Sequence, residues 1–421
     1  MRDQPLPSKR SRLRTFRLVC RPHEQPAVES LLAAEGFGLE PEPYLDSARV
    51  LTSEPKPLGS SLAAAFGLIY ILDKSSMLPP LCLEPGVGEA VVDFCASPGS
   101  KTGVLAELVG EHGLVVANEP KPKRYQTLGH NLGHMNLPQV IRTRYPGEKF
   151  PDCGNWGRIL LDVPCSGWGT AEKNPQVLSL WREETLGPLL SLQQRLLTRA
   201  AEILAPGGRL IYSTCTTNRE ENEAQVLWAA SELGLDLVPL DPWPGFVFDA
   251  PQDSSASGVL RVNGPACGGQ SFFVASLSKP GTWEPEVRSR QGVQVAAKVQ
   301  ERVKTQVNWQ ALPPGRVDLV QDRLEFFPEP ARHWPGLLWQ GVFLGRGRKG
   351  LRLSPRTRFL LPERPRETDL VVDQIQVLSQ LLQGQSLPAP GPGPLGGLYW
   401  QDLPLGWVTI KGRRCMWTDR I

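Results

Sequence analysis

The sequence lacks the cysteine spacing of a zinc site or a redox dithiol, because none of its eight cysteines forms a Cys-x-x-Cys pair. It also lacks a basic amino-terminal region followed by a short apolar core, and no apolar run is long enough to span a bilayer. We therefore expect no metal site, a cytoplasmic location, and free thiols that are available for chemistry. The cysteines are Cys20, Cys82, Cys95, Cys153, Cys165, Cys215, Cys267 and Cys415.

Charge of one sign is not in excess, since 46 Lys and Arg residues against 43 Asp and Glu residues leave a net charge of +3. The distribution of charge is more informative, because basic residues gather in two places. Separated basic clusters are typical of proteins that bind a phosphate backbone, although each residue alone is more often solvated surface charge. The clusters are Lys9, Arg10, Arg12, Arg14, Arg17 and Arg21, and then Arg346, Arg348, Lys349, Arg352, Arg356 and Arg358.

Three parts of different character are expected, with boundaries near residues 84 and 280. Residues 1–84 begin with a basic strand-like run and a helix-like run, which is typical of a small α+β appendage. Residues 85–280 alternate strands and helices, which predicts an α/β fold with a parallel sheet covered on both faces. Residues 281–421 predict a linker and a small β-rich domain. Within that last part we expect a helix over residues 293–307 and, over residues 386–397, a low-complexity connector that packs no core.

Two strands of the middle part are expected to present reactive side chains at their ends. The apolar run at residues 159–161 stops at Asp162, and Pro164 prevents further strand pairing, so Asp162 and Cys165 follow a buried strand. The strand at residues 209–214 leads directly to Cys215. Open α/β sheets bind ligands beyond the carboxyl ends of their strands, and a thiolate is a strong nucleophile once its pKa is lowered. A pair of such cysteines beside a carboxylate favours nucleophilic chemistry over two ordinary buried thiols.

A ligand turn is expected between the strand at residues 90–95 and the following helix. Its Ser100-Lys101-Thr102 ending is similar to that of a phosphate-binding loop, but the two glycines of that motif are missing. Glu119 ends the next strand, where Rossmann-like folds place a carboxylate that holds ribose hydroxyls. The dinucleotide signature G-x-G-x-x-G is also absent, and this favours S-adenosylmethionine over a nicotinamide dinucleotide.

Three sequence segments together resemble the Nol/Nop/Sun family of RNA cytosine-5 methyltransferases. They are Asp-Phe-Cys-Ala-Ser-Pro-Gly-Ser-Lys-Thr at residues 93–102, Leu-Asp-Val-Pro-Cys-Ser-Gly at residues 161–167 and Tyr-Ser-Thr-Cys-Thr at residues 212–216. Glu-Glu-Asn-Glu at residues 220–223 adds to the resemblance, which covers about residues 12–279 and is strongest to the bacterial small-subunit ribosomal RNA subgroup. The C-terminal part is more loosely similar to that subgroup's additional RNA-binding region.

The resemblance implies a Rossmann-like, seven-stranded class I methyltransferase core, an N-terminal RNA-binding appendage and a C-terminal PUA-like RNA-binding domain. It implies that Cys215 attacks C6 of a cytosine, that Asp162 hydrogen-bonds the base, and that Cys165 assists release of the product. S-adenosylmethionine is the implied cofactor, with ribosomal RNA as partner, either free or within the 30S subunit or an assembly intermediate. A monomer is expected. The implied cofactor-binding residues are Cys95, Ala96, Ser97, Pro98, Gly99, Ser100, Lys101, Glu119 and Asp162.

Two positions depart from the family pattern. Pro146 stands where relatives carry an aspartate that contacts the adenine of the cofactor, and Leu72 stands where a glutamine is common. Two alternatives stay open: a transfer RNA methyltransferase of the same class, and a ribosome-assembly protein that binds RNA without catalysis, for which Pro146 is the only support. For Lys101 and Glu119 the structural alternatives are a surface lysine and a solvated strand end.

Overall fold

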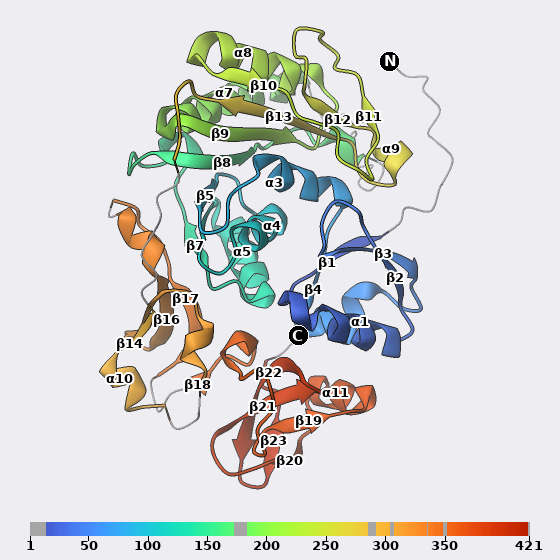
Figure 1. Ribbon diagram of the computed structural model, residues 1–421, viewed down its shortest axis with the longest axis vertical. Helices are drawn as coiled ribbons and strands as arrows, with labels where there is room; N and C mark the ends of the chain where they lie inside the picture. Colours follow the sequence, from blue (N-terminus) through green and yellow to red (C-terminus); the bar gives the residue numbers. More distant parts are fainter. Residues whose placement is uncertain are drawn as a thin grey trace.

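The computed structural model describes residues 14–171, 183–284, 292–303, 307–334, 336–347 and 352–419. Four β-sheets organise these residues: an N-terminal sheet, a large central sheet and two C-terminal sheets. In Figure 1 the central sheet carries helices on both faces, the N-terminal unit lies at the lower right, the first C-terminal sheet lies at the lower left, and the second lies at the bottom. Among the described residues, no helix combines the length and the apolar character needed to cross a membrane.

The N-terminal unit is an antiparallel sheet in the order β2-β3-β1-β4, with two helices packed on it. The basic strand and the helix expected near the N-terminus are confirmed as β1 and α1. The described residues of the first basic cluster are largely paired within the fold: Arg17 with Glu107 at 2.7 Å and Arg21 with Glu111 at 3.5 Å. Lys9, Arg10 and Arg12 lie outside the described residues. The elements are β1 (Thr15–Leu18), α1 (Gln25–Ala34), β2 (Gly38–Pro41), β3 (Ala48–Ser53), α2 (Leu62–Ala65) and β4 (Ile69–Ile71).

The central sheet has the order β11-β12-β13-β9-β8-β5-β6-β7, and β10 pairs with the other end of β13. The chain runs outward from β5 to β7 and then returns to β8 on the opposite side of β5, so the strand order reverses between β5 and β8. Strands β5 to β10 with β13 form the expected seven-stranded core, and β11 and β12 extend it. The strands are β5 (Ala90–Asp93), β6 (Leu114–Asn118), β7 (Val140–Thr143), β8 (Trp156–Asp162), β9 (Leu204–Thr214), β10 (Asp236–Val238), β11 (Phe248–Asp249), β12 (Leu260–Val262) and β13 (Phe272–Ser278).

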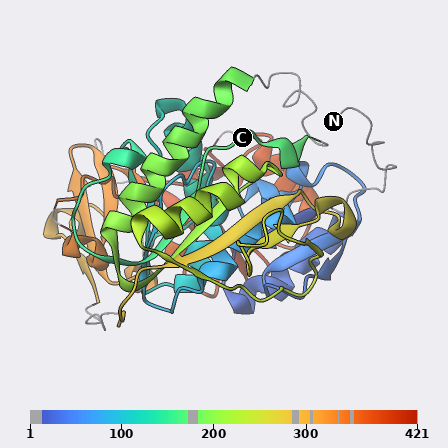
Figure 2. The same ribbon diagram turned by 90° about the horizontal axis from the view of Figure 1, so that it is seen from above.

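Alternate residues of each central strand pack against different helices, as the two-residue period of a strand requires. Ile159 and Leu161 of β8 share a core cluster with residues of α7, whereas Leu160 shares one with residues of α4 and α5. Both faces of the sheet are therefore covered by helices, and α7 and α8 lie side by side on one of them (Figure 2). The helices are α3 (Leu78–Leu83), α4 (Ser100–Val109), α5 (Pro122–Met135), α7 (Leu186–Ile203), α8 (Glu223–Leu233) and α9 (Gly264–Cys267).

The C-terminal part forms two five-stranded sheets, in the orders β14-β15-β16-β17-β18 and β19-β21-β22-β23-β20. Its β-rich character is as predicted. Its elements are β14 (Val293–Val295), α10 (Ala297–Gln300), β15 (Gly315–Val320), β16 (Arg323–Pro328), β17 (Val342–Arg346), β18 (Arg352–Leu353), β19 (Leu370–Val372), α11 (Ile375–Leu382), β20 (Leu387–Pro388), β21 (Leu395–Trp400), β22 (Leu403–Lys411) and β23 (Arg414–Met416).

Two predictions for this part are wrong. Residues 293–295 form β14 because they pair in parallel with β15, and only Ala297–Gln300 is helical; residues 304–306 lie outside the described part. The expected connector over residues 386–397 contains β20 and the start of β21. Gly397 is buried there and its N–H donates to Asp369 Oδ1 at 2.8 Å, while a Cβ at this position would lie 2.7 Å from the Tyr399 ring. Glycine is therefore required by close packing inside the sheet.

The N-terminal unit and the last C-terminal sheet share one hydrophobic core. Phe16, Leu31 and Phe66 belong to the same buried cluster as Trp400 and Trp417. The rings of Phe66 and Trp417 meet edge to face with centroids 5.3 Å apart. The two ends of the chain, expected as separate domains, are thus packed together.

Candidate active site

The carboxyl ends of three adjacent strands bring the predicted residues together. β5 pairs in parallel with β8, and β8 pairs in parallel with β9, so that Asp162 lies opposite Ser213. Asp93 ends β5, Asp162 ends β8, and Cys215 directly follows β9. The reversal of strand order falls at the same place, which is where open α/β sheets bind ligands.

Lys101 and Asp162 form an ion pair at this edge of the sheet. The ammonium Nζ of Lys101, in the first turn of α4, lies 2.7 Å from Asp162 Oδ2, and Ser213 Oγ donates to Oδ1 at 2.8 Å. The Lys101 ammonium also lies 4.9 Å from the centre of the Phe272 ring. Burial alone would lower the pKa of Lys101, but the Asp162 carboxylate outweighs it and raises that pKa. Lys101 is 8% exposed, so the alternative of a surface lysine is wrong.

The two strand-end cysteines lie in contact, with Cys165 Sγ and Cys215 Sγ 3.2 Å apart. A hydrogen bond from the Cys165 thiol lowers the pKa of Cys215 against the effect of burial, and Lys101 lowers it further. The same contact, together with burial, raises the pKa of Cys165 well above its ordinary value. Burial also raises the pKa of Cys95, so that thiol stays neutral. Cys215 is therefore the sulfur on which a thiolate forms most easily.

Glu221 ties together the loops that carry the two cysteines. Its carboxylate accepts hydrogen bonds from the Ser166 backbone N–H at 2.8 Å, from Ser166 Oγ, and from Gln193 Nε2 at 3.1 Å. Ser166 Oγ is in turn 2.8 Å from Thr216 Oγ1, next to Cys215. The sequence placed Glu221 within the family-like run at residues 220–223 without a role, and Gln193 carried no signal beyond its position in a helix.

Arg261 and Glu223 form a second buried contact behind Cys215. Arg261 Nη1 donates to both carboxylate oxygens of Glu223, at 2.8 and 2.9 Å, and Nη2 donates to the Thr217 carbonyl at 2.9 Å. This pair anchors the segment that follows Cys215 to β12 and α8. Sequence reasoning missed Arg261 because it lies 46 residues from Cys215 in the chain. Only the pairing of β12 with β13 brings it back beside the segment that follows Cys215.

The predicted ligand turn is a compact loop between β5 and α4. The Ala96 N–H donates to the Asn118 carbonyl at 2.9 Å, and Arg124 Nη2 donates to the Ser97 carbonyl at 2.7 Å. The peptide bond between Ser97 and Pro98 is cis. Gly99 has a φ of +107°, a conformation that glycine adopts without strain, and α4 begins immediately after it. The loop thus presents the N-terminus of α4 at the carboxyl edge of the sheet. Backbone N–H groups at a helix N-terminus can donate to a polar or anionic group of a ligand.

Glu119 lies beside this loop and is 2% exposed, so the alternative of a solvated strand end is wrong. Its carboxylate accepts from the Lys121 N–H at 2.9 Å and pairs with Arg124 Nε at 3.1 Å. Arg124 therefore joins the ligand turn to Glu119. No sequence pattern indicated this role of Arg124, although the residue falls in the first turn of the helix after Glu119.

The residues present fit a bound S-adenosylmethionine in their donor and acceptor chemistry. The first turn of α4 offers backbone N–H groups, and the Glu119 carboxylate can accept from ribose hydroxyls. Asp93 accepts from Thr102 Oγ1 at 2.7 Å through one oxygen, while its other oxygen is buried without a partner among the described residues. Burial raises the pKa of Asp93 to about 7.

The two departures from the family pattern have different surroundings. Pro146 is exposed after β7 and offers no side-chain acceptor. The nearby Asn118 side chain is already bonded, accepting from Thr143 Oγ1 and the Tyr145 N–H, both at 2.9 Å. Leu72 is buried, and its carbonyl accepts from Thr15 Oγ1 at 2.7 Å. The adenine end of a cofactor would therefore lack a carboxylate partner at Pro146.

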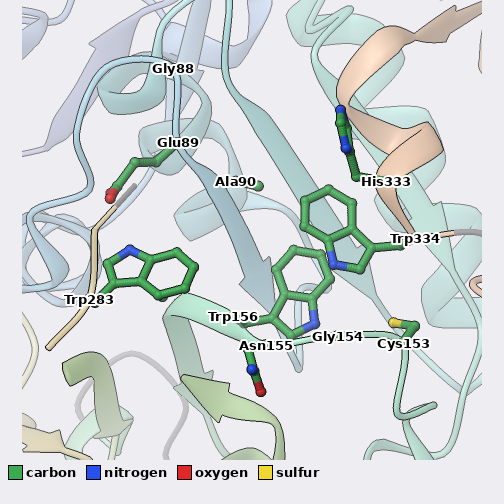
Figure 3. Close-up of a pocket in the computed structure, with 11 residues that line it drawn as sticks. Gly88, Glu89, Ala90, Cys153, Gly154, Asn155, Trp156, Trp283, His333 and Trp334 are labelled. Atoms are coloured by element: carbon green, nitrogen blue, oxygen red, sulfur yellow. The ribbon is translucent and has the colours of Figure 1, made fainter. Parts of the chain in front are cut away.

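A cavity of about 180 Å³ lies at the opposite edge of the central sheet, where β5 and β8 begin (Figure 3). Trp156 and Trp334 stack beside it with ring centroids 4.2 Å apart, and Trp283 and Glu89 also line it. None of the predicted site residues borders this cavity. It is therefore separate from the ligand turn and the cysteine pair.

Strand order, helix layers and a ligand turn at the reversal of the sheet define the fold class of Rossmann-like methyltransferases. The chain's residues 80–278 match the family described as 16S rRNA methyltransferase RsmB/F. Among solved structures, that of a methyltransferase homolog protein from Pyrococcus horikoshii is similar to this chain. The two are 30% identical, with a TM-score of 0.56 over 66% of this chain and 87% of that chain. The chain belongs to the RsmB/F methyltransferase family.

Curated relatives extend the same similarity. Ribosomal RNA small subunit methyltransferase F from Salmonella arizonae is 37% identical over 59% of this chain and 53% of its own length. The protein of the same name from Citrobacter koseri is 35% identical over 61% and 55% of the two chains. The chain thus spans about half the length of these relatives. The structure of NSun6 from Pyrococcus horikoshii with SFG shares the fold, with a TM-score of 0.56 over 64% and 91% of the chains at 20% identity.

Proposed function

We propose that this chain transfers a methyl group from S-adenosylmethionine to C5 of a cytosine in small-subunit ribosomal RNA. The observation that carries the proposal is the contact between Cys165 and Cys215 at 3.2 Å, on the strand ends that also present Asp162 and Lys101. The names of the curated relatives support ribosomal RNA as the substrate class.

Cys215 is the proposed nucleophile. C5 of cytosine is a weak nucleophile until a thiolate adds to C6, because the addition moves the electron pair of the C5–C6 double bond onto C5 and, through C4, onto N3. The lowered pKa of Cys215, caused first by the Cys165 hydrogen bond, supports this role for its sulfur. The new bond joins Cys215 Sγ to C6.

Asp162 is the proposed partner of the N3 and N4 edge of the base, and it stabilises the adduct as N3 gains a proton. Two of its contacts support a fixed orientation, the ion pair with Lys101 at 2.7 Å and the hydrogen bond from Ser213 at 2.8 Å. A carboxylate held in this way needs little reorganisation when the base charge changes.

Cys165 is proposed to assist product release. Release requires transfer of the C5 proton to a base such as water, so that the C5–H electron pair forms the C5–C6 double bond. The bond between C6 and Cys215 Sγ then breaks, and its electron pair returns to sulfur. The neutral Cys165 thiol, 3.2 Å away, can donate its hydrogen bond to the departing thiolate. The raised pKa of Cys165 keeps that proton available.

Residues 95–101, Glu119 and Asp162 are proposed to hold the cofactor. The bound cofactor supplies an electrophilic methyl group. Arg124 holds the turn and Glu119 in a fixed relative position, because it bonds to the Ser97 carbonyl at 2.7 Å and to the Glu119 carboxylate at 3.1 Å. The target base must leave any duplex to reach the strand ends, so a flipped or single-stranded cytosine is implied.

The two-cysteine proposal is tested with labelled S-adenosylmethionine and small-subunit ribosomal RNA. Cys215→Ala should lose methyl transfer, because no adduct forms. Cys165→Ala should methylate but remain attached to RNA as a denaturant-stable adduct that runs as a shifted band on a denaturing gel. Cys267→Ala, at a half-buried cysteine in α9, is the control. Continued cytosine methylation by Cys215→Ala would assign the nucleophile elsewhere.

The substrate is tested by comparing methylation of free ribosomal RNA, assembled 30S subunits and transfer RNA under the same conditions. Ribosomal RNA in one of its two forms should be preferred, and a preference for transfer RNA would overturn the substrate class. The exposed Pro146 is the observation that favours the non-catalytic alternative. A calorimetric titration without S-adenosylmethionine binding at physiological concentrations would support that alternative.

A further inference from the structure

Three arginines lie in one row across the first C-terminal sheet. Arg323 of β16 is paired with Arg346 of β17, and Arg346 is paired with Arg352 of β18. Directly paired residues project from the same face of a sheet, and like charges in such positions repel. Arg346 and Arg352 are exposed, and neither forms an ion pair within the described residues. A row of this kind is costly unless an anion covers it.

Aromatic rings alternate with the arginines on this outer face. The Arg323 guanidinium lies 4.7 Å from the centre of the Phe343 ring, and that of Arg316 lies 5.6 Å from the Phe327 ring. Leu324 and other intervening residues of β16 are buried on the core side. Basic groups that alternate with half-exposed rings are typical of surfaces that take a nucleic-acid strand.

The row continues onto the methyltransferase core. Gln340 Oε1 accepts hydrogen bonds from Arg142 Nη2 at 2.7 Å and from the Tyr125 hydroxyl at 3.1 Å. The guanidinium groups of Arg142 and Arg144 lie 4.7 and 5.4 Å from the centre of the Tyr125 ring. The Gln340 N–H also donates to the Arg142 carbonyl at 3.0 Å, which joins β7 to the segment that precedes β17. Arg144 directly follows β7, at the sheet edge that holds Glu119.

The acidic groups near this surface neutralise only part of its charge. Glu325 is buried and pairs with Arg323 Nε at 2.7 Å. Asp318 pairs with Lys298 at 2.8 Å and lies 3.7 Å from Arg316. No carboxylate of the described residues pairs with Arg346 or Arg352, so the basic charge is unneutralised toward β18.

The second basic cluster of the sequence thus divides into two groups. Arg356 pairs with Asp419 and donates to the Ala65 carbonyl. Arg358 pairs with Glu24, so both arginines make contacts that stabilise the fold. Arg348 and Lys349 lie outside the described residues. Only Arg346 and Arg352 of the described members face solvent.

We propose that the surface formed by Arg142, Arg144, Tyr125, Arg323, Phe343, Arg346 and Arg352 binds the phosphate backbone of the RNA that flanks the target nucleotide. This basic–aromatic strip runs from the carboxyl edge of the central sheet to β18. It rests on the proposed function for the identity of its ligand. Phosphates would contact the arginines, and unstacked bases would lie against the two rings.

The test is a charge reversal at the far end of the strip, Arg346→Glu with Arg352→Glu. Binding to a labelled small-subunit ribosomal RNA fragment is measured by anisotropy at several salt concentrations. Affinity should fall at least about tenfold, and the slope of log K against log salt should shrink by about 1.4, as loss of two phosphate contacts predicts. KM for RNA should rise, while affinity for S-adenosylmethionine stays unchanged.

Two matched variants complete the experiment. Lys411→Glu with Arg413→Glu reverses the same number of exposed charges in the other C-terminal sheet and should leave RNA affinity unchanged. Arg346→Lys with Arg352→Lys retains the charge and should restore most of the salt dependence. Thermal unfolding of each variant verifies the fold.

Unchanged RNA affinity in the charge-reversed variant would overturn the proposal, as would an equal loss in the Lys411 and Arg413 control. Unchanged RNA affinity combined with lost binding to purified 30S ribosomal proteins would assign the strip to a protein partner instead. Because RNA binding is measured without catalysis, an inactive parent protein that shows the expected salt effect would refute the methyltransferase function alone.

Discussion

At the scale of single residues, the two thiols of the site differ in the direction of their pKa shifts. Cys165 donates toward Cys215, Lys101 adds positive charge nearby, and the pKa values of the two thiols are driven apart. Two cysteines that are buried to a similar extent therefore differ in how easily each forms a thiolate. The sequence predicted that both lie at one sheet edge, but it contained no information on which of the two thiols has the lower pKa.

This inequality predicts how Cys215 reacts with an alkylating reagent. Cys165→Ala removes the donated hydrogen bond, so the pKa of Cys215 should rise, and alkylation by iodoacetamide near neutral pH should slow about tenfold for each unit of the rise. The rate at Cys215 is followed by peptide mass spectrometry between about pH 6 and about pH 10. Cys267→Ala should not move the midpoint of the profile. An unmoved midpoint in Cys165→Ala would mean that Cys165 does not tune Cys215.

At the scale of elements, the loops after β8 and β9 are joined by the Gly169 N–H, which donates to the Cys215 carbonyl at 2.9 Å, and by the buried carboxylate of Glu221. Glu221 is fully buried and accepts from both the backbone and the side chain of Ser166, as well as from Gln193. A buried carboxylate is stable only when such donors surround it. The separation of the two sulfur atoms therefore depends on a residue that need not touch the substrate.

Glu221→Gln tests this support. A glutamine keeps the shape but replaces one acceptor oxygen with an amide nitrogen, so at least one buried donor loses its partner. We expect a loss of about 2 to 4 kcal/mol in the free energy of unfolding, measured by chemical denaturation. Methyl transfer should fall as well. Glu220→Gln, at the exposed neighbouring position, should change stability by less than about 0.5 kcal/mol. Equal stability of the two variants would show that Glu221 does not hold the loops.

The success of sequence reasoning differs between elements for physical reasons. The central strands were predictable because short apolar runs such as residues 159–161 end at polar or proline residues. The strands at residues 387–388 and 395–400 were not, because their glycines and prolines predict a flexible segment, whereas packing against Tyr399 and Asp369 requires Gly397. Glu221 and Arg261 were equally hidden, since their burial arises only from tertiary contacts.

At the scale of the whole molecule, the two ends of the chain close on the methyltransferase core. Phe66 of the N-terminal unit meets Trp417 near the C-terminal end of the described residues. Arg356 lies at the same junction and donates to the Ala65 carbonyl at 3.0 Å and to His134 Nδ1 at the end of α5. No local pattern predicts contacts between residues so far apart, because they depend on how completed units pack. The junction makes the stability of the three parts interdependent.

His134 gives this junction a pH dependence. Burial, and then the Arg356 charge, lower the pKa of His134 from 6.5 to about 4, and its neutral ring lies with Nε2 2.6 Å from the Ala64 carbonyl. Between these two pKa values the unfolded chain binds the proton and the folded chain does not. Stability from this group is therefore complete above about pH 6.5 and is lost as the pH falls toward about 4.

Chemical denaturation at about pH 7.5, 6 and 5 measures the effect. The parent protein should lose about 2 kcal/mol more than His134→Gln over this range, since the glutamine does not titrate. His130→Gln, at an exposed position one turn earlier in α5, should keep the parent's dependence. Parallel pH profiles for the parent and His134→Gln would show that the junction is insensitive to this histidine, and the acid sensitivity would then belong to other groups.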